Sequence, residues 1–370
     1  MQTLIIGFIL LSIISGWFVL WKVPGIPKHS KNKQINKKIS VIIPARNEER
    51  NLPMLLKSLT GQTLQPVEVL VVDDDSEDDT AEVAASFGTR VLQYDSKEVG
   101  WQGKSAACFV GAQAAKGEYL LFLDADVFLP SEESLRAILL EFKRQDFKGA
   151  LSIQPYHVIQ SLYENFSVLF NIIVLAGMNR FSILKERLKP AGAFGPSLLI
   201  DRNLYFEMGG HELVKDSIME NIDLGSAMLK QHIPIHLYSG YECLHFRMYP
   251  DGIKSLSEGW TKSFAQASTS THPLILIGIS LWISGAFISF GFFVWGMVSG
   301  NFTTLLLSIL GYVLYYLQFY RMANLAGKFS GGLLIFYPLF FFYFVGLFAW
   351  SAIKTFVFRT VSWKGRSIDV

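Results

Sequence analysis

The sequence contains little cysteine and little charge. Cys108 and Cys243 are the only cysteines in 370 residues. They show no metal-ligand spacing and predict no disulfide, which fits a reducing cytosolic face. Charged residues make up 17% and hydrophobic residues 51% of the chain, a balance too apolar for an ordinary soluble enzyme. The net charge of +2 gives no indication of a nucleic-acid partner. Internal repeats are absent too, and the length predicts one large or two small domains.

The apolar excess is concentrated at the two ends of the chain. Leu4 to Trp21 is an uncharged run that is just long enough for one spanning helix. A cleaved signal peptide is the alternative, but no basic residue precedes the run and no cleavage site follows it. Six lysines and no acid lie between Lys22 and Lys38, so the positive-inside rule keeps the following domain in the cytoplasm. We predict an N-terminal transmembrane anchor over residues 1–21 and a basic linker over 22–37.

The C-terminal third of the chain also predicts membrane helices. No charged residue occurs from Pro273 to Tyr320, a length that suits two spans, and Leu333–Ile353 is a further apolar stretch. A polar linker is expected between them, from Arg321 to Gly332. If every stretch spans, the basic tail 354–370 ends outside the cell membrane, against the positive-inside rule. The alternative for the last stretch is a re-entrant or interfacial path. Residues 273–353 are therefore predicted as transmembrane or re-entrant helices of a multi-pass protein.

Residues 38–245 have the pattern of an α/β domain. Short β-branched runs alternate with segments of helical periodicity. This alternation predicts βαβ units and a mainly parallel sheet. Ligands of such sheets bind beyond the carboxyl ends of the strands. The expected strands are 38–44, 67–72, 89–93 and 120–123, and the expected helices are 51–59, 78–87 and 104–115.

Polar clusters follow the first two expected strands. The first is Pro44-Ala45-Arg46-Asn47-Glu48, which is suited to the base and ribose of a nucleotide, although it can also be an ordinary helix cap. The second begins with Asp73 and Asp74, whose carboxylates can accept hydrogen bonds from a uracil imide or a ribose hydroxyl. A solvated turn before an acidic helix start is the alternative for this pair.

Two more clusters complete the expected edge of the sheet. Gly103-Lys104 combines a flexible backbone with a positive charge for phosphate, although its spacing is not that of a P-loop. Asp124-Ala125-Asp126 follows an uninterrupted apolar strand. Carboxylates at i and i+2 can share a hard divalent cation, and that cation can hold a diphosphate. A simple turn is the alternative, but the position after the strand favours a nucleotide-sugar enzyme.

In this order and spacing, the four clusters resemble the family 2 glycosyltransferases of the GT-A fold. The resemblance covers about residues 38–245. It implies a nucleotide-sugar donor, usually a UDP-sugar, an inverting reaction, and Mg²⁺ or Mn²⁺ at Asp126. It also implies that Asp73 or Asp74 contacts the base and that Asp124 lies near the ribose or the sugar. Asp75 is a departure, because the family often has glycine there.

The resemblance also predicts where the general base lies. Members usually carry a Glu-Asp pair about a hundred residues beyond the Asp-x-Asp, and the matching residues here are Glu220 and Asn221. An amide cannot act as a base, so Glu220 or Asp223 must serve, and Glu220 is favoured because it occupies an acid position of the pattern. A carboxylic-acid acceptor, already ionised at neutral pH, would need less help from a base.

Further segments are predicted to lie on the acceptor side. Phe194 and Gly195, and His211 after two glycines, match the family's acceptor loop, with plain turns as the alternative. Residues 246–272 mix aromatic and basic side chains, including Arg247 and Trp260, as an interfacial amphipathic segment does. Gly259 stands where processive members carry arginine, which argues against a polysaccharide synthase.

The membrane segments favour a lipid acceptor. Over nearly its whole length the chain resembles the bacterial carotenoid glycosyltransferases, in the stretches 151–157, 193–196, 247–249, 258–262 and 363–366. That resemblance implies transfer of glucose from UDP-glucose to the terminal carboxylate of a C30 carotenoid, 4,4'-diaponeurosporenoate. Two alternatives stay open: transfer to another membrane lipid, such as a glycerolipid or a ceramide-like molecule, and a non-catalytic membrane scaffold that binds nucleotide.

Overall fold

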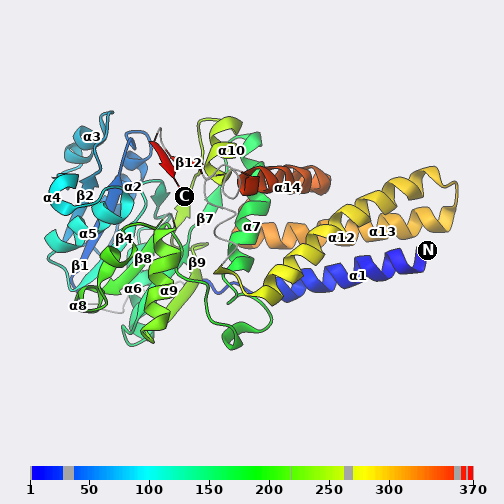
Figure 1. The fold of residues 1–370 in the computed structure, drawn as a ribbon, viewed down its shortest axis with the longest axis horizontal. Helices are drawn as coiled ribbons and strands as arrows, with labels where there is room; N and C mark the ends of the chain where they lie inside the picture. The colour runs from blue at the N-terminus through cyan, green and yellow to red at the C-terminus, as the bar shows by residue number, and fades with distance from the viewer. Residues whose placement is uncertain are drawn as a thin grey trace. The chain divides into compact units, whose positions relative to one another are not determined.

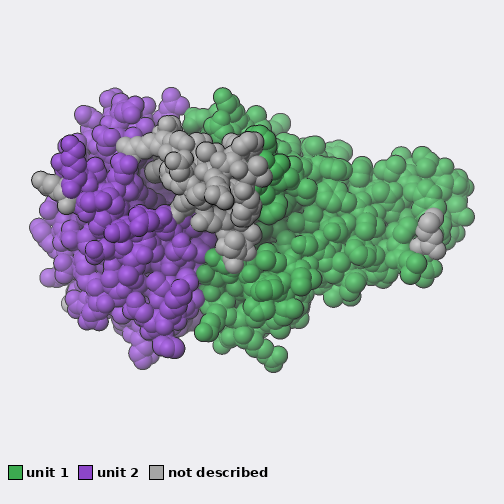
Figure 2. Space-filling view, viewed as in Figure 1, with its two compact units in different colours: residues 1–23, 157–191, 248–370 green, residues 24–156, 192–247 purple. Residues whose placement is uncertain are grey.

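The chain folds into two compact units, each built from segments that are distant in sequence. The computed structural model describes residues 2–27, 37–217, 219–261, 270–353, 360–363 and 366–369. Unit 1 comprises residues 1–23, 157–191 and 248–370, and unit 2 comprises residues 24–156 and 192–247 (Figure 2). Residues 157–191 interrupt the α/β domain in sequence and belong to unit 1.

Unit 2 is built on a seven-stranded, mainly parallel sheet with the order β3-β2-β1-β4-β8-β6-β9 (Figure 1). Only β8 is antiparallel to its neighbours, β4 and β6. The predicted α/β class and mainly parallel sheet are therefore confirmed. The strands are β1 (Ile39–Ala45), β2 (Glu68–Asp73), β3 (Arg90–Gln93), β4 (Tyr119–Leu123), β6 (Ala150–Gln154), β8 (Ser197–Asp201) and β9 (Ile235–Ser239).

The helices of unit 2 follow the strands as the alternating pattern predicts. Helix α5 lies so close to the sheet that Gly111 faces Ile42 of β1 and Val72 of β2, with no room for a Cβ atom. A short pair, β5 (Val127–Phe128) and β10 (His245–Phe246), adjoins the sheet's acidic edge. The helices are α2 (Leu52–Thr60), α3 (Thr80–Ser86), α4 (Ser96–Val99), α5 (Lys104–Ala114), α6 (Ser134–Arg144), α8 (Arg202–Glu207), η3 (Gly210–Val214) and α9 (Glu220–Lys230).

The central strands end together, and this brings the acidic clusters to one edge. Strand β1 pairs with β2 so that Ala45 is opposite Asp73, and with β4 so that Ile42 is opposite Phe122. All five residues of β4 are buried, as expected for a strand covered on both faces. Parallel strands point their carboxyl ends the same way, so the loops after β1, β2 and β4 meet.

Unit 1 is mainly helical, and its described residues include four helices that are long and apolar enough to span a membrane: Gln2–Val19, Pro273–Val298, Phe302–Ala326 and Leu333–Ile353. Helices α1 (Gln2–Val19), α12 (Pro273–Val298) and α13 (Phe302–Ala326) run side by side (Figure 1). The remaining elements are β7 (Tyr156–Val158), which begins in unit 2, η1 (Leu162–Ser167), α7 (Val168–Gly177), η2 (Lys185–Arg187), α10 (Ile253–Thr261), β11 (Gly327–Lys328), η5 (Leu333–Phe336), α14 (Tyr337–Ile353), β12 (Thr360–Trp363) and β13 (Arg366–Asp369).

Small and polar residues join the apolar helices of unit 1. Ser15 Oγ donates to the carbonyl of Gly278 at 2.8 Å, so α1 and α12 approach closely. Trp282 Nε1 donates to Gln318 Oε1 at 2.9 Å, and Gln318 Nε2 donates to the carbonyl of Ile13 at 2.6 Å. Because lipid tails offer no hydrogen-bond partner, small residues and buried polar side chains are the usual means of helix association in membranes.

The prediction of a polar linker from Arg321 to Gly332 is wrong for the first half of that segment. Helix α13 continues to Ala326, and Arg321 is a helical residue within it. Its guanidinium lies over the Trp17 ring, 4.0 Å from the centroid, and donates to the carbonyl of Leu20 at 3.1 Å. A charged side chain at a helix end can extend to polar groups without interrupting the helix. Most of the predicted basic linker (28–36) and residues 354–359, 364, 365 and 370 of the predicted tail lie outside the described residues.

Candidate active site

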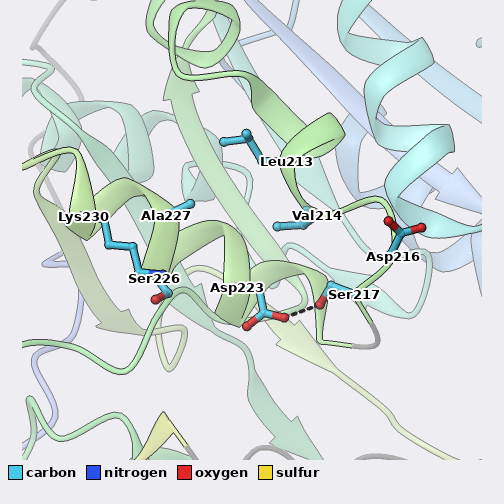
Figure 3. A pocket seen from close by; sticks show the side chains of 8 residues that line it. All are labelled: Leu213, Val214, Asp216, Ser217, Asp223, Ser226, Ala227 and Lys230. Carbon is cyan, nitrogen blue, oxygen red and sulfur yellow. Dashed lines mark hydrogen bonds between the residues drawn. The ribbon is translucent and has the colours of Figure 1, made fainter. Parts of the chain in front are cut away.

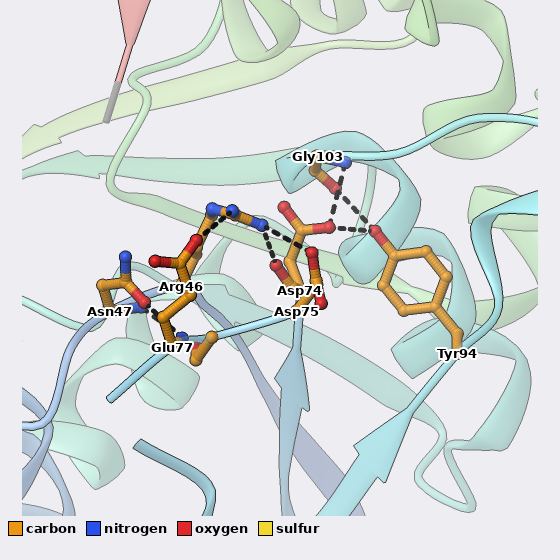
Figure 4. A network of polar contacts seen from close by, with 8 residues as sticks. Arg46, Asn47, Asp74, Asp75, Glu77, Tyr94 and Gly103 are labelled. Atoms are coloured by element: carbon orange, nitrogen blue, oxygen red, sulfur yellow. Dashed lines mark hydrogen bonds and ion pairs between the residues drawn. The ribbon is translucent and has the colours of Figure 1, made fainter. Parts of the chain in front are cut away.

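Arg46 and Asn47 connect the loop after β1 to the loop after β2 (Figure 4). The buried Arg46 guanidinium donates to the carbonyl of Asp74 at 2.6 Å and forms ion pairs with Asp75 at 3.5 Å and Glu77 at 3.8 Å. The side-chain oxygen of Asn47 accepts a hydrogen bond from the backbone N–H of Glu77 at 2.8 Å. Both predicted donor-binding residues thus hold the two loops together.

Asp75 adopts a backbone conformation that is open to glycine. Its φ is +60°, in the left-handed region. Aspartate and asparagine enter this region more readily than most residues with a side chain, because their short polar group bonds locally. The departure at Asp75 therefore leaves the backbone of the β2 loop in a glycine-like conformation.

Asp73 and Asp74 are both buried, and within the described part of the chain each has a carboxylate oxygen without a hydrogen-bond partner. One oxygen of Asp74, Oδ1, accepts hydrogen bonds from the Tyr94 hydroxyl at 2.5 Å and from the Gly103 backbone N–H at 3.2 Å (Figure 4). Its Oδ2, and Oδ1 of Asp73, have no hydrogen-bond partner among the described residues. Buried carboxylate oxygens normally find a donor, so this edge is suited to a ligand that carries N–H or O–H groups.

Lys104, Asp124 and Glu220 form a half-buried ionic cluster. Lys104 Nζ lies 2.7 Å from Asp124 Oδ1 and 3.0 Å from Glu220 Oε1, and it donates to the carbonyl of Gly195 at 3.1 Å. Burial by itself lowers the pKa of the Lys104 ammonium, but Asp124 and Glu220 outweigh that effect and its pKa is raised. The lysine is therefore charged, and three protein oxygens lie within 3.1 Å of its Nζ.

Asp126 lies beside two other acidic side chains, Asp124 and Glu48. Burial, together with repulsion from Asp124 and Glu48, raises the pKa of Asp126 to about 8. No ion pair with Asp126 is found among the described residues, and no group of three His, Cys, Asp or Glu side chains there could hold a metal ion. A divalent cation would offset this repulsion, and carboxylate oxygens are the ligands that Mg²⁺ and Mn²⁺ prefer. The residues present therefore fit such a cation, with the remaining ligands coming from phosphate and water.

Phe194 and Gly195 belong to a loop that packs tightly on α9. The amide of Asn221 donates from Nδ2 to the carbonyl of Gly195 at 2.7 Å, and the Ala193 N–H donates to the carbonyl of Asn221 at 3.3 Å. The side chain of Phe194 is buried, and its N–H donates to Ser152 Oγ at 2.9 Å. The backbone of this loop, rather than the Phe194 ring, therefore faces the ionic cluster.

We expect Gly225→Ala to destabilise the fold by about 1–3 kcal/mol, the usual cost of overpacking. A Cβ atom at Gly225 would overlap the backbone of Gly192 and Ala193. Thermal unfolding of the detergent-solubilised protein measures the effect. Ser226→Ala, at the next position of α9, is the matched control and should melt like the wild type. Equal melting temperatures for all three proteins would contradict the close approach of loop and helix.

His211 is fully buried and pairs with Tyr205. Its Nδ1 lies 2.8 Å from the Tyr205 hydroxyl, and its Nε2 has no hydrogen-bond partner among the described residues. Burial lowers the pKa of His211 to about 3; Glu220 opposes this shift and Lys104 adds to it. His211 is therefore neutral at physiological pH and supports the loop that precedes α9.

The low pKa of His211 predicts acid sensitivity. The unfolded chain takes up this proton below about pH 6.5, whereas the folded chain does so only near pH 3. Folding stability should therefore fall as the pH drops below about 6.5, by about 2 kcal/mol at pH 5. Unfolding of the wild type and His211→Gln across pH 8 to 5 tests this, because only the wild type carries the contribution. Parallel pH profiles would contradict it.

Asp223 lines a pocket whose lining residues include no member of the ionic cluster. It is exposed on α9 and accepts a hydrogen bond from Ser217 Oγ (Figure 3). It lines a pocket of about 310 Å³, together with Leu213, Val214, Asp216, Ser217, Ser226, Ala227 and Lys230. Of the two candidate bases, Glu220 is the one that lies with Asp124 and Lys104.

The two remaining acceptor-side residues lie in different units. Arg247 follows β10, whose Phe246 pairs with Val127 of β5, so the register brings its backbone level with Asp126 in unit 2. Trp260 belongs to α10 in unit 1 and stacks on Phe170, with ring centroids 4.8 Å apart. In the same helix, Gly259 leaves room for the ring of Tyr249, which explains why a larger residue is absent there. Residues 262–269 of this predicted segment lie outside the described part of the chain.

Two supporting residues were not identified from the sequence. Tyr94 directly follows β3, and that position beyond a strand's carboxyl end was a usable signal. Ser152 lies within β6 and bonds to Phe194 through a contact distant in sequence, which no local pattern indicates. Asn221 was recognised, but its hydrogen bond to Gly195 depends on the tertiary fold.

The fold and the acidic strand ends are those of a glycosyltransferase of the GT-A type. The sequence model of "Glycosyl transferase family 2" matches residues 40–202. The 4,4'-diaponeurosporenoate glycosyltransferase of Staphylococcus aureus strain N315 is 36% identical over 344 residues, covering 92% of this chain and 91% of that protein. The protein of the same name from strain MRSA252 is 37% identical over 353 residues. The chain thus belongs to the family 2 glycosyltransferases.

A solved structure supports the same fold assignment. The mannosyltransferase PcManGT from Pyrobaculum calidifontis, in complex with GDP-Man and Mn²⁺, matches with a TM-score of 0.53. The match covers 97% of this chain and 100% of that chain, at 15% sequence identity. At this identity the likeness establishes the fold, and it extends over nearly the whole length of both proteins.

Proposed function

We propose that this glycosyltransferase moves glucose from UDP-glucose to the terminal carboxylate of a C30 carotenoid, 4,4'-diaponeurosporenoate. The observation that carries the proposal is the likeness to proteins of that name over 92% of the chain. The four long apolar helices support an acceptor that is dissolved in the membrane. The lysine-rich segment after α1 supports a cytoplasmic active site at the cell membrane, where the soluble donor is available.

The acidic edge of the sheet is suited to the donor. Asp73 and Asp74 have buried oxygens that no described residue pairs with and that can accept from the uracil imide and the ribose hydroxyls. Asp126 would hold a divalent cation, Mg²⁺ or Mn²⁺, which when bound supplies positive charge to the leaving diphosphate. Arg247, at the level of Asp126, can donate to the same phosphates. Glu48 and Asp124, whose charges act on Asp126, would lie on the sugar side of the donor.

Glu220 is the proposed base. It lies beside Asp124 and Lys104, whereas Asp223 lines another pocket. In the reaction, an acceptor carboxylate oxygen bonds to the anomeric carbon of glucose while the bond from that carbon to the diphosphate oxygen breaks. Close to Asp124 and Asp126, an acceptor carboxyl group is partly protonated, because burial and like charge favour its neutral form. Glu220 would take up that proton, and a single displacement would invert the anomeric centre.

Expression in a host that makes the C30 carotenoid acid but lacks its glycosyltransferase tests the proposal. The expected product is a coloured glucosyl ester, more polar than the acid and cleaved by mild alkali. A host without the carotenoid enzymes is the control. Unchanged pigment alongside a new colourless glycolipid would reject the carotenoid acceptor and favour another membrane lipid. Unchanged pigment and lipids, with UDP bound to the protein, would favour a nucleotide-binding scaffold.

A further inference from the structure

The backbone carbonyl of Gly195 accepts hydrogen bonds from two side chains that belong to different helices. The Gly195 oxygen accepts from Lys104 Nζ at 3.1 Å and from Asn221 Nδ2 at 2.7 Å. The same lysine contacts Asp124 and Glu220. We call Lys104, Asn221 and the Gly195 carbonyl the Gly195 clamp. Through it, the start of α5, the residue after β4, the loop before β8 and the start of α9 are connected.

The chemistry of the clamp accounts for the amide at position 221. A carbonyl oxygen only accepts hydrogen bonds, so its partner must be a donor, and the NH₂ group of asparagine is one. A carboxylate there would place two acceptors within 2.7 Å and add a negative charge beside Glu220. Asn221 is 5% exposed, so water cannot easily replace the lost bond. In this chain, an acid at position 221 would therefore disrupt the site.

The hydrogen-bonding capacity of Lys104 is likewise used by groups of the protein. An ammonium group has three protons, and three protein oxygens lie 2.7 Å, 3.0 Å and 3.1 Å from Lys104 Nζ. This arrangement leaves little capacity for a donor phosphate. It does fix the distance between the donor-side carboxylate of Asp124 and the acceptor-side carboxylate of Glu220, which would otherwise repel each other.

We propose that Lys104 and Asn221 are positioning residues that act through the Gly195 clamp to hold Glu220 in register with Asp124. The inference rests on the proposed function in one respect, the role of Glu220 toward the acceptor. It gives Asn221 the role of a required hydrogen-bond donor, and it assigns the Lys104 ammonium to the protein rather than to the diphosphate of the donor.

Substitutions at position 221 test the proposal by the order of their effects. We expect Asn221→Asp to lower kcat on the order of 100-fold, as misplaced catalytic groups do, and Asn221→Ala to lower it less, because alanine removes the donor without adding repulsion. KM for UDP-glucose should change by less than about 3-fold, since ground-state donor binding does not use the clamp. Asn203→Asp on α8 is the matched control, because Asn203 is exposed and its side chain makes no described contact with the site. Equal or higher activity of Asn221→Asp would overturn the proposal and identify position 221 as a base position.

Lys104 is tested by nucleotide binding and by coupling to Glu220. Lys104→Met should bind UDP and UMP as the wild type does, whereas a lysine that contacts the diphosphate would lose UDP affinity selectively. Lys104→Arg, which keeps the charge, should recover part of the transfer rate. Combining Lys104→Met with Glu220→Gln should reduce kcat no further than Glu220→Gln alone, within about 3-fold. Selective loss of UDP binding, or full additivity, would overturn the positioning role.

Hydrogen exchange separates this inference from the proposed function. Backbone exchange in residues 192–197 should be faster in Asn221→Asp and in Lys104→Met than in the wild type and Asn203→Asp. This readout needs no acceptor, so it holds even if the acceptor is another lipid. Unchanged exchange in both variants would contradict the clamp while leaving the carotenoid proposal intact.

Discussion

The Asp126→Ala enzyme is expected to transfer sugar at least about 1000-fold more slowly than the wild type. The cation that Asp126 would hold contributes several kcal/mol of charge stabilisation at the leaving diphosphate, and the variant loses it. Binding of UDP should lose its dependence on Mn²⁺ in the same variant. Rates with saturating UDP-glucose and calorimetric titrations of UDP with and without Mn²⁺ measure the two effects.

The stability of the same variant separates loss of function from loss of fold. The raised pKa of Asp126, about 8, means that its burial destabilises the folded state increasingly as the pH rises from about 4 to 8. Removing the carboxyl should therefore leave the melting temperature at pH 7 equal or higher. Asp146→Asn is the control, because Asp146 is exposed and its φ of +55° suits asparagine. A well-folded Asp126→Ala enzyme with normal activity would contradict the assignment.

Glu220→Gln is expected to lower transfer about 100-fold or more at pH 6, since a glutamine cannot accept the acceptor's proton. Asp223→Asn, which changes the exposed acid on the same helix, should stay within about 3-fold of the wild type. The pH dependence of the Glu220→Gln defect distinguishes a carboxylic-acid acceptor from a hydroxyl acceptor. A carboxylic-acid acceptor loses its proton to solvent as the pH rises, so the defect of Glu220→Gln should shrink toward pH 8.5. A hydroxyl acceptor stays protonated there, and a defect that is constant with pH would contradict the carboxylate.

The strand ends could be predicted because local sequence determines them. The runs before Asp73 and Asp124 are apolar and short, as strands covered on both faces are, and an acid that follows such a run must lie at the sheet edge. The charged Arg321, by contrast, led to a wrong expectation of a linker. Its guanidinium is accommodated by Trp17 and by the carbonyl of Leu20, contacts that only the packed helices provide.

The partners within the site could not be predicted from the sequence. Lys104 meets Asp124 and Glu220 because the sheet order brings α5, β4 and α9 together, and residue spacing does not contain that order. The direction of the Gly195 carbonyl is also a tertiary feature, so Asn221 looks like a lost acid until its hydrogen bond is seen. Asp75 shows the reverse case: its residue type differs from the glycine of the family pattern, but its φ of +60° is one that glycine adopts readily.

Glucosyl transfer to a carotenoid carboxylate is tested most directly with labelled donor. Membranes that contain this chain are incubated with 4,4'-diaponeurosporenoate, Mn²⁺ and UDP-[¹⁴C]glucose, and membranes with the Asp126→Ala chain serve as the blank. The label should appear in the pigment fraction, migrate with a coloured band and be released by mild alkali, as an ester bond requires. Label in a colourless glycerolipid, or in a pigment product that resists alkali, would contradict this function.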